Sequence, residues 1–364
     1  MARISPADLH EGVVVLLESF GTPADIADRV AESLVDADLK GHHSHGVLRV
    51  PLYGERAETS RLDPDARPEV VRANGPVVRM DGRYAFGQYN GREMIDLITD
   101  ATAEYGVGVV SIRNATHLGR MGEWAERAAD ADAMFVGLAR ASTLTVGMAG
   151  SAERRIATNP MTFGVPTFDA LQFPIVLDIA TSQVAHGKIR ERDHTDERVP
   201  EAWTTTDAGE PVTDPRAFEE GEGALLPLGG RESGYKGFGL AVMAELFSGI
   251  LGAGHVAGQS TDRTGGNDAV FVAVDPRQFT SRADVEDQVT AFDDHVRGTE
   301  FSEHVSAGVA AHGENAMLPG EPEYVTAREQ RERGIDLADR IVESLAEFGT
   351  EQGVRTDLPA AFDL

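Results

Sequence analysis

Apolar residues at the start of the chain recur with the period of α-helices. Leu9, Val13, Leu16 and Phe20 share one face of a helix that begins at the capping signal Ser5-Pro-Ala-Asp8 and ends at Gly21. A second start signal, Thr22-Pro-Ala-Asp25, precedes Ile26, Val30 and Leu34, which have the same spacing. The first forty residues are therefore predicted to form two amphipathic helices.

The middle of the chain alternates between short apolar runs and longer amphipathic segments. Strands are predicted at 77–82, 107–112, 135–139, 162–165, 174–179 and 269–274, and helices at 91–105, 121–131 and 239–252. Residues 62–76 and 191–222 are polar and rich in Pro or Gly, which predicts loops, and residues 327–348 are predicted to form a closing helix. This alternation is typical of an α/β fold.

Charge changes this picture. The chain of 364 residues has a formal net charge of −27, only three lysines (Lys40, Lys188 and Lys236) and no cysteine. Acids spread along the whole chain, with almost no lysine, indicate adaptation to molar salt, where screening reduces self-repulsion. The charge argues against nucleic-acid binding, and no apolar run is long enough to cross a membrane. We therefore expect a halophilic, cytoplasmic protein.

Candidate chemistry begins in the segment 38–53. If Gly46 opens a helix, His45, Arg49 and Tyr53 lie four residues apart on one face. An imidazole beside a guanidinium suits a small carboxylate with a neighbouring carbonyl group. The alternatives are a solvated polar turn and, because His43 and His45 have the His-x-His form, a metal-dependent hydrolase.

Two further residues stand out. His117 follows a predicted strand and precedes a predicted helix, where α/β proteins often bind ligands. Lys236 lies among glycines in Ser233-Gly-Tyr-Lys-Gly-Phe-Gly239, and small neighbours would let its ammonium approach an anionic ligand. By contrast, the glycines of 106–108 precede their strand instead of following it, so they do not indicate a Rossmann dinucleotide site.

Six segments in order carry a family resemblance: Ser44-His-Gly-Val-Leu-Arg49, Asn114-Ala-Thr-His117, Ala157-Thr-Asn-Pro160, Leu177-Asp-Ile-Ala-Thr-Ser182 with Gly187-Lys188, Trp203 to Pro215, and Gly234-Tyr-Lys-Gly-Phe-Gly-Leu240. With the turn Leu318-Pro-Gly-Glu321, they span nearly the whole chain. The sequence resembles the malate/L-lactate dehydrogenase family, which also includes ureidoglycolate and sulfolactate dehydrogenases and a cyclic imino-acid reductase.

The resemblance implies an α/β fold with a non-Rossmann nicotinamide-binding domain, in which helices flank a mixed sheet. Residues 76–304 would form this NAD(P)-binding domain. Residues 1–75 with 305–364 would form a mainly helical substrate and dimerisation domain, and the protein would be a homodimer or a higher homo-oligomer. No metal is implied.

The resemblance also implies roles for individual residues. His117 would be the acid/base, His45 and Arg49 would hold the substrate, and Ser44 and Tyr53 would complete the substrate site. The residues expected at the NAD or NADP cofactor are Thr143, Thr158, Asn159, Asp178, Ile179, Ala180, Lys236, Gly320 and Glu321.

Together these points predict reversible hydride transfer between a nicotinamide and C2 of a small 2-hydroxy or 2-oxo acid, with malate or L-lactate as the leading substrates. Within the family, the alternatives are ureidoglycolate, sulfolactate and cyclic imino acids. Outside it, the alternatives are the metal-dependent hydrolase and a non-catalytic acidic binding protein.

The acid excess gives a first testable prediction. In dilute buffer, unscreened carboxylates repel, so folding or activity should collapse as the salt concentration falls from molar levels. Circular dichroism melting curves and activity across a potassium chloride series would measure this. An unchanged melting temperature and full activity after dialysis into dilute buffer would contradict the salt adaptation.

Overall fold

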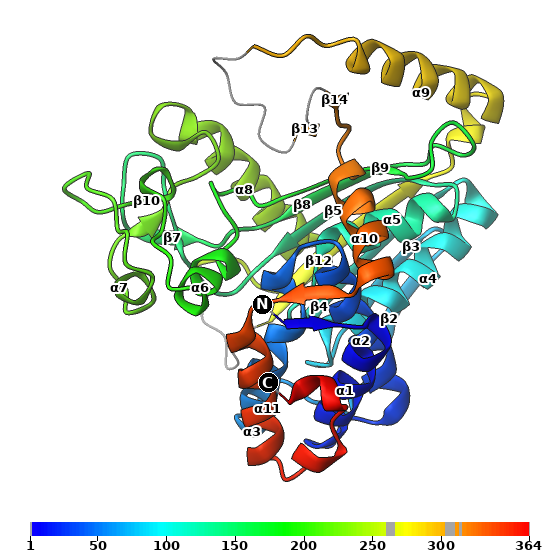
Figure 1. The fold of residues 1–364 in the computed structure, drawn as a ribbon. Coiled ribbons are helices and arrows are strands. Elements are labelled where there is room, and N and C mark those ends of the chain that lie inside the picture. Colours follow the sequence, from blue (N-terminus) through cyan, green and yellow to red (C-terminus); the bar gives the residue numbers. More distant parts are fainter. Residues whose placement is uncertain (1, 260–265, 303–309, 313–314, 364) are drawn as a thin grey trace.

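The computed structural model describes residues 2–259, 266–302, 310–312 and 315–363, and its centre is a seven-stranded sheet (Figure 1). The strand order is β2-β3-β4-β12-β5-β8-β9. β3 and β4 run parallel, whereas the other neighbouring strands run antiparallel. This mixed sheet confirms the predicted fold class. Its strands are β2 (Glu69–Asn74), β3 (Val77–Asp81), β4 (Val107–Ala115), β5 (Met134–Arg140), β8 (Met161–Val165), β9 (Ile175–Ile179) and β12 (Asn267–Val274).

Helices cover both faces of the sheet because its strands are apolar on both sides. Val110 and Ile112 of β4 belong to one core with α4 (Gly87–Tyr105) and α5 (Met121–Asp130). Ser111 points the other way and donates a hydrogen bond of 2.9 Å to the carbonyl of Leu251 in α8 (Gly230–Gly252). This alternation is the two-residue period of a β-strand.

A smaller sheet forms a second layer with a core of its own. Its strand order is β10 (Thr204–Thr205), β11 (Ala224–Leu225), β6 (Val146–Gly147) and β7 (Arg154–Ile156). Around it lie α6 (Gly187–His194), η3 (Glu201–Trp203) and α7 (Pro215–Glu219), and Ile189 and Phe218 are buried in its core. The prediction of a polar surface loop over 191–222 was therefore wrong, because Phe218 anchors this segment.

The two ends of the chain share a third core. It joins α1 (Pro6–Glu18), α2 (Ala24–Leu39) and α3 (Val50–Glu58) to α11 (Asp339–Glu351) and η7 (Ala360–Phe362). β1 (Ala2–Ile4) pairs with β15 (Ile335–Leu337), and Figure 1 shows these strands side by side near both termini. The domain boundaries themselves stay predictions, and the one at residue 305 lies outside the described residues.

Other elements connect these layers: η1 (His43–His45), η2 (Val47–Arg49), η4 (Pro276–Gln278), α9 (Arg282–Arg297), β13 (Ala311–His312), β14 (Asn315–Ala316), α10 (Glu321–Arg333) and η6 (Arg355–Asp357). α9 begins with a full capping box between Ser281 and Asp284.

Three further predicted elements differ from the structure. The loop over 62–76 contains β2, whose residues are all exposed and therefore lack an alternating pattern. The closing helix is broken at Gly334, where a φ of 96° ends α10 before β15. α8 begins at Gly230 instead of residue 239, and its glycines allow close packing, since a Cβ on Gly237 would lie 2.3 Å from the backbone nitrogen of Leu228.

Phe362 offers a test of how the chain ends hold together. Its ring is 1% exposed, and a Cβ on Gly12 would lie 2.3 Å from it. Phe362→Ala should lower the free energy of unfolding by about 3–5 kcal/mol, because it leaves a cavity between the two ends. Urea denaturation measures the change, with Phe279→Ala, at an 81% exposed residue, as the control. Equal stability of the two variants would show that this contact is dispensable.

Candidate active site

A buried carboxylate organises the histidine-rich segment. Asp38, at the end of α2, is 1% exposed and accepts hydrogen bonds of 2.8 Å from the His43 ring and from the backbone N–H of Val47. Gly46 passes so close that a Cβ there would lie 2.2 Å from the Asp38 carboxylate. Asp38 therefore fixes the two turns η1 and η2, which carry His45 and Arg49.

Those turns replace the helix predicted from Gly46. α3 begins only at Val50, so Tyr53 is helical whereas His45 and Arg49 lie in short 3₁₀ turns. The Ser44 hydroxyl lies 3.0 Å from Nδ1 of His45, and the Ser44 carbonyl accepts a 2.7 Å hydrogen bond from Nε of Arg49. Ser44 thus positions His45 and Arg49, with which it was predicted to form the substrate site.

His117 meets this segment from the loop after β4. Its Nδ1 shares a 3.0 Å hydrogen bond with the Tyr53 hydroxyl, and its ring stacks on His45 with centroids 5.4 Å apart. The amide nitrogen of Gln88 donates a 2.7 Å hydrogen bond to the same hydroxyl. Tyr53 and Gln88 therefore fix one ring nitrogen of His117 and leave Nε2 for chemistry.

The electrostatics keep these histidines neutral. Burial lowers the pKa of His117 well below its ordinary value, and the nearby Arg49 charge lowers it further. The same two causes depress the pKa of His45. Loss of solvation also lowers the pKa of Arg49 to about 10. A bound anion would offset the Arg49 charge and raise the pKa of His117 toward the range of an acid/base.

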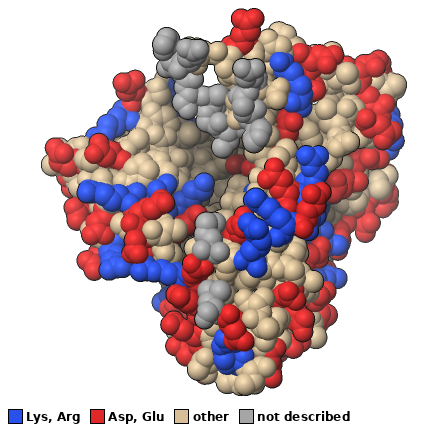
Figure 2. All heavy atoms as spheres, viewed as in Figure 1, with Lys and Arg blue, Asp and Glu red and all other residues tan. Residues whose placement is uncertain are grey.

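These residues line a cavity of about 110 Å³, which we call the substrate cavity. Its basic side chains are Arg49, Arg56, Arg190, His45, His117 and His186. None of the described residues that line it is Asp or Glu, although acids are spread widely over the face shown in Figure 2. The site is therefore a positive cavity in a strongly acidic protein.

A larger cavity of about 490 Å³ adjoins the first, and His45, His117 and Thr158 line both. Asp178, Ile179 and Ala180, at the end of β9, line this larger cavity, and they are three of the residues expected at the cofactor. Asp178 also accepts a 2.7 Å hydrogen bond from the backbone N–H of Gly122 in the first turn of α5. Burial raises the pKa of Asp178. Thr143 lines the substrate cavity instead.

Four residues predicted at the cofactor do not line either cavity. Asn159 is fully buried, and its amide nitrogen donates to the Ala241 carbonyl and to Glu245. Lys236 is exposed on α8, with its ammonium 5.9 Å from the Tyr235 ring, and the glycine-rich segment around it forms the first turns of this helix. Gly320 and Glu321 start α10, where Glu321 pairs with Arg297 at 3.0 Å.

The rare lysines have different positions. Lys40 joins α2 to α5 through ion pairs of 2.7 Å with Asp36 and Glu126, so its role is structural. Lys188 lines the larger cavity, and its rarity was the signal that could have marked it as a site residue. Sequence reasoning also missed Arg56 and Arg190. Arg56 follows Arg49 by seven residues, which is two helical turns, so the same periodicity could have found it.

The metal-site alternative finds no support in the described part of the chain. No group there of three or more His, Cys, Asp or Glu side chains could hold a metal ion. His43 uses Nδ1 to bind Asp38. Within the same residues, no helix is long and apolar enough to cross a membrane.

Comparisons with known proteins agree on one family. The family model for malate/L-lactate dehydrogenase matches residues 4–346. Malate dehydrogenase of Pyrococcus abyssi is 30% identical over 97% of this chain and 96% of its own, and L-sulfolactate dehydrogenase of Methanocaldococcus jannaschii is 29% identical over 97% and 98%. The structure of malate dehydrogenase from Pyrococcus horikoshii superposes with a TM-score of 0.85, at 26% identity over 97% and 96% of the two chains. The chain therefore belongs to the malate/L-lactate dehydrogenase family.

Proposed function

We propose that this protein is an NAD(P)-dependent dehydrogenase that interconverts a small 2-hydroxy acid and its 2-oxo acid. The observation that carries the proposal is that one cavity contains both a candidate acid/base and a guanidinium without an ion-pair partner among the described residues. Arg49 forms no ion pair with a described carboxylate and lines the same cavity as His117. The names of the relatives support malate, L-lactate and sulfolactate as the substrates to test first.

Arg49 would bind the carboxylate of the substrate. Its Nε is held by the Ser44 carbonyl, so the two terminal nitrogens remain for the ligand. Two parallel N–H···O bonds from a guanidinium attract a carboxylate and also orient it. The neighbouring carbon, C2, would then be held in a fixed position beside His117, which lowers the entropic part of the barrier.

His117 would exchange the hydroxyl proton of the substrate. In the oxidation direction, Nε2 takes the proton from the C2 hydroxyl as the hydride leaves C2, and in reduction the protonated ring returns it to the carbonyl oxygen. The Tyr53 hydroxyl, 3.0 Å from Nδ1, holds the ring in place during both steps. Binding of the substrate anion to Arg49 would prepare His117 for this exchange by raising its pKa.

The larger cavity fits a nicotinamide cofactor, either NAD or NADP. Its volume of about 490 Å³ is within the range of cofactor sites, and its lining combines apolar side chains such as Ile179 with polar ones such as Thr158 and Lys188. Asp178, Ile179, Ala180 and Thr158 would hold the cofactor there, and Thr143 would lie at its border with the substrate. When bound, the nicotinamide supplies or accepts the hydride at C2.

The charge of the chain supports a proposal about the conditions in which the enzyme works. We propose a halophilic, cytoplasmic enzyme, because 60 acidic residues face only 33 lysines and arginines in the sequence. Such a surface stays hydrated and soluble where salt screens its repulsion.

We also propose a homodimer or a larger homo-oligomer that uses α8. One face of this helix packs on the sheet, whereas Met243, Phe247 and Ile250 on the other face are 47%, 51% and 66% exposed. Leu240, Leu246 and Leu251 extend the same apolar surface. A contiguous apolar surface of this kind supports an interface, and the family resemblance makes a second copy of the chain the expected partner.

The decisive test of the function is a panel of 2-oxo acids with NADH and NADPH at high potassium chloride. We expect His117→Asn to lower kcat on every accepted acid by on the order of a hundredfold or more, because the proton exchange is lost. Cofactor affinity, measured by nicotinamide fluorescence without substrate, should stay near that of the wild type. No reduction of any acid by the wild type, or full turnover by the variant, would refute the proposal.

The oligomer has a separate test. Ile250→Glu together with Phe247→Glu places two charges in the proposed interface, so light scattering after size exclusion should show monomers where the wild type forms dimers. Phe279→Glu is the matched control, because Phe279 is 81% exposed and lies outside α8. A monomeric wild type, or an unchanged mass in the double variant, would show that α8 does not form the interface.

A further inference from the structure

The substrate cavity holds more positive charge than one carboxylate can neutralise. Arg49, Arg56 and Arg190 all line it, and the described acids form no ion pair with Arg49 or Arg56. Glu219 is the one described acid paired with Arg190, accepting a hydrogen bond of 3.2 Å from its Nε. The three arginines and Glu219 sum to two uncompensated positive charges. Lactate or pyruvate would neutralise only one of them.

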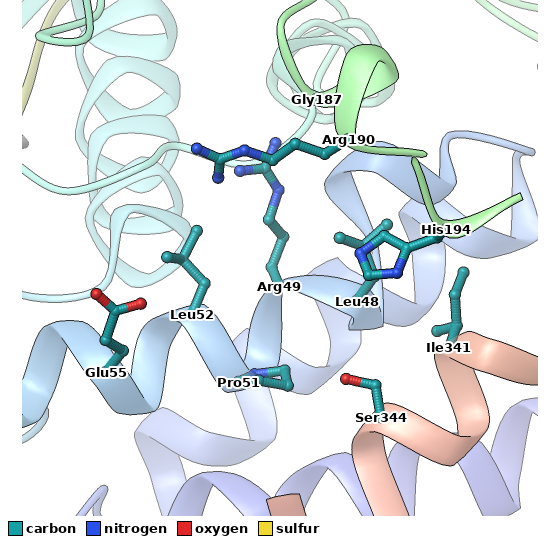
Figure 3. A pocket seen from close by; sticks show the side chains of 10 residues that line it. All are labelled: Leu48, Arg49, Pro51, Leu52, Glu55, Gly187, Arg190, His194, Ile341 and Ser344. Carbon is teal, nitrogen blue, oxygen red and sulfur yellow. The ribbon is translucent and has the colours of Figure 1, made fainter. Parts of the chain in front are cut away.

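The arginines come from opposite walls but reach the same space. Nη2 of Arg49 lies so near Gly187, the first residue of α6, that a Cβ there would be 2.7 Å away. Arg190 lies three residues further on, on the same face of that helix. Figure 3 shows the two side chains pointing toward each other, Arg190 from α6 and Arg49 from the turn before α3.

The arginines also repel one another. Loss of solvation lowers the pKa of Arg56, and the charge of Arg190 contributes to that lowering. The charge of Arg190 likewise lowers the pKa of Arg49. Guanidiniums collected without counter-charges in a partly enclosed cavity destabilise the free protein, and a ligand with matching negative charges relieves this.

Glu219 holds Arg190 without removing it from the cavity. Its carboxylate accepts from Nε of Arg190 and lies 2.6 Å from the His186 ring nitrogen, so it fixes both side chains from one side. The terminal nitrogens of Arg190 then remain for a ligand. On the far side of Arg49 and Arg190 lies a third cavity of about 260 Å³, which is lined by Glu55 and His194 among others. Glu55 forms no ion pair with either arginine in the described structure.

We propose that Arg190, assisted by Arg56, binds a second acidic group of the substrate, so that this enzyme prefers dianionic 2-hydroxy and 2-oxo acids to monocarboxylic ones. The proposal rests on the proposed function and adds its substrate class. Arg49 holds the carboxylate on C2, and Arg190 holds an oxyanion carried on the next carbon, either a carboxylate or a sulfonate. Each such charged hydrogen bond contributes roughly tenfold to hundredfold in affinity.

The test compares kcat/KM on pyruvate, oxaloacetate and 3-sulfopyruvate. The wild type should prefer the two dianions, and the better of these identifies the second group as carboxylate or sulfonate. Arg190→Gln should lower kcat/KM on the preferred dianion roughly tenfold to hundredfold, with a loss on pyruvate at least several-fold smaller. Arg49→Lys should instead impair all three acids. Arg192→Gln is the matched control, since Arg192 lies on the same helix but lines neither the substrate cavity nor the cavity behind it.

A binding measurement separates this proposal from the proposed function. Calorimetry would compare succinate and propionate, which carry two charges and one and have no hydroxyl or oxo group at C2 to react. If no acid is turned over but succinate binds the wild type more tightly and loses this advantage in Arg190→Gln, the anion site is supported while the dehydrogenase proposal fails. If the Arg190 variant does not fold, Arg56→Gln replaces it, because Arg56 of α3 lines the same cavity and its loss should also weaken binding of the dianion. Equal losses on mono- and dianions, or no wild-type preference for dianions in both assays, would overturn the proposal.

Discussion

The active site depends on one buried carboxylate. Asp38 closes the turn after α2 with hydrogen bonds to His43 and Val47, and Gly46 leaves just enough space for it. Burial raises the pKa of Asp38, whereas the His43 hydrogen bond and charge favour its ionised form. The hydrogen-bonded pair of Asp38 and His43 thus stabilises the irregular turns between α2 and α3. Ser44, His45 and Arg49 lie in the two turns that Asp38 holds in place. The positions of these substrate-site residues therefore depend on the third core, to which α2, the helix that carries Asp38, belongs.

The substrate cavity and the protein surface have opposite charge. Acids dominate the surface, where no single one is essential because each of them interacts with water and salt. Inside the substrate cavity the charge is positive, comes from arginine and lies beside two histidines with depressed pKa values. Salt screens the exterior far more strongly than the partly enclosed arginines, so adaptation to salt and recognition of anions can coexist.

Sequence reasoning succeeded where a residue acts through a local motif. His45, Arg49, Tyr53 and His117 do meet, although the helix expected to align them begins later, at Val50. It could not anticipate positions that packing determines. Asn159 belongs to a buried hydrogen-bond network with Glu245, and Lys236 lies on the exposed surface of a helix whose Gly237 packs closely on Leu228. Arg190 could not be placed, since only the tertiary fold brings α6 against the turn that carries Arg49.

The pairing of β1 with β15 sets an order of assembly. Ala2 lies opposite Leu337, so the third core closes only across almost the full length of the chain. During synthesis the central sheet, whose last strand in sequence is β12 (Asn267–Val274), can form while the N-terminal helices still lack α11 and β15. The turn anchored by Asp38 touches this late-closing core through Gln330, which donates to the Asp38 and Leu39 carbonyls. The turn that carries His45 and Arg49 therefore lacks this support until the chain has been made as far as Gln330.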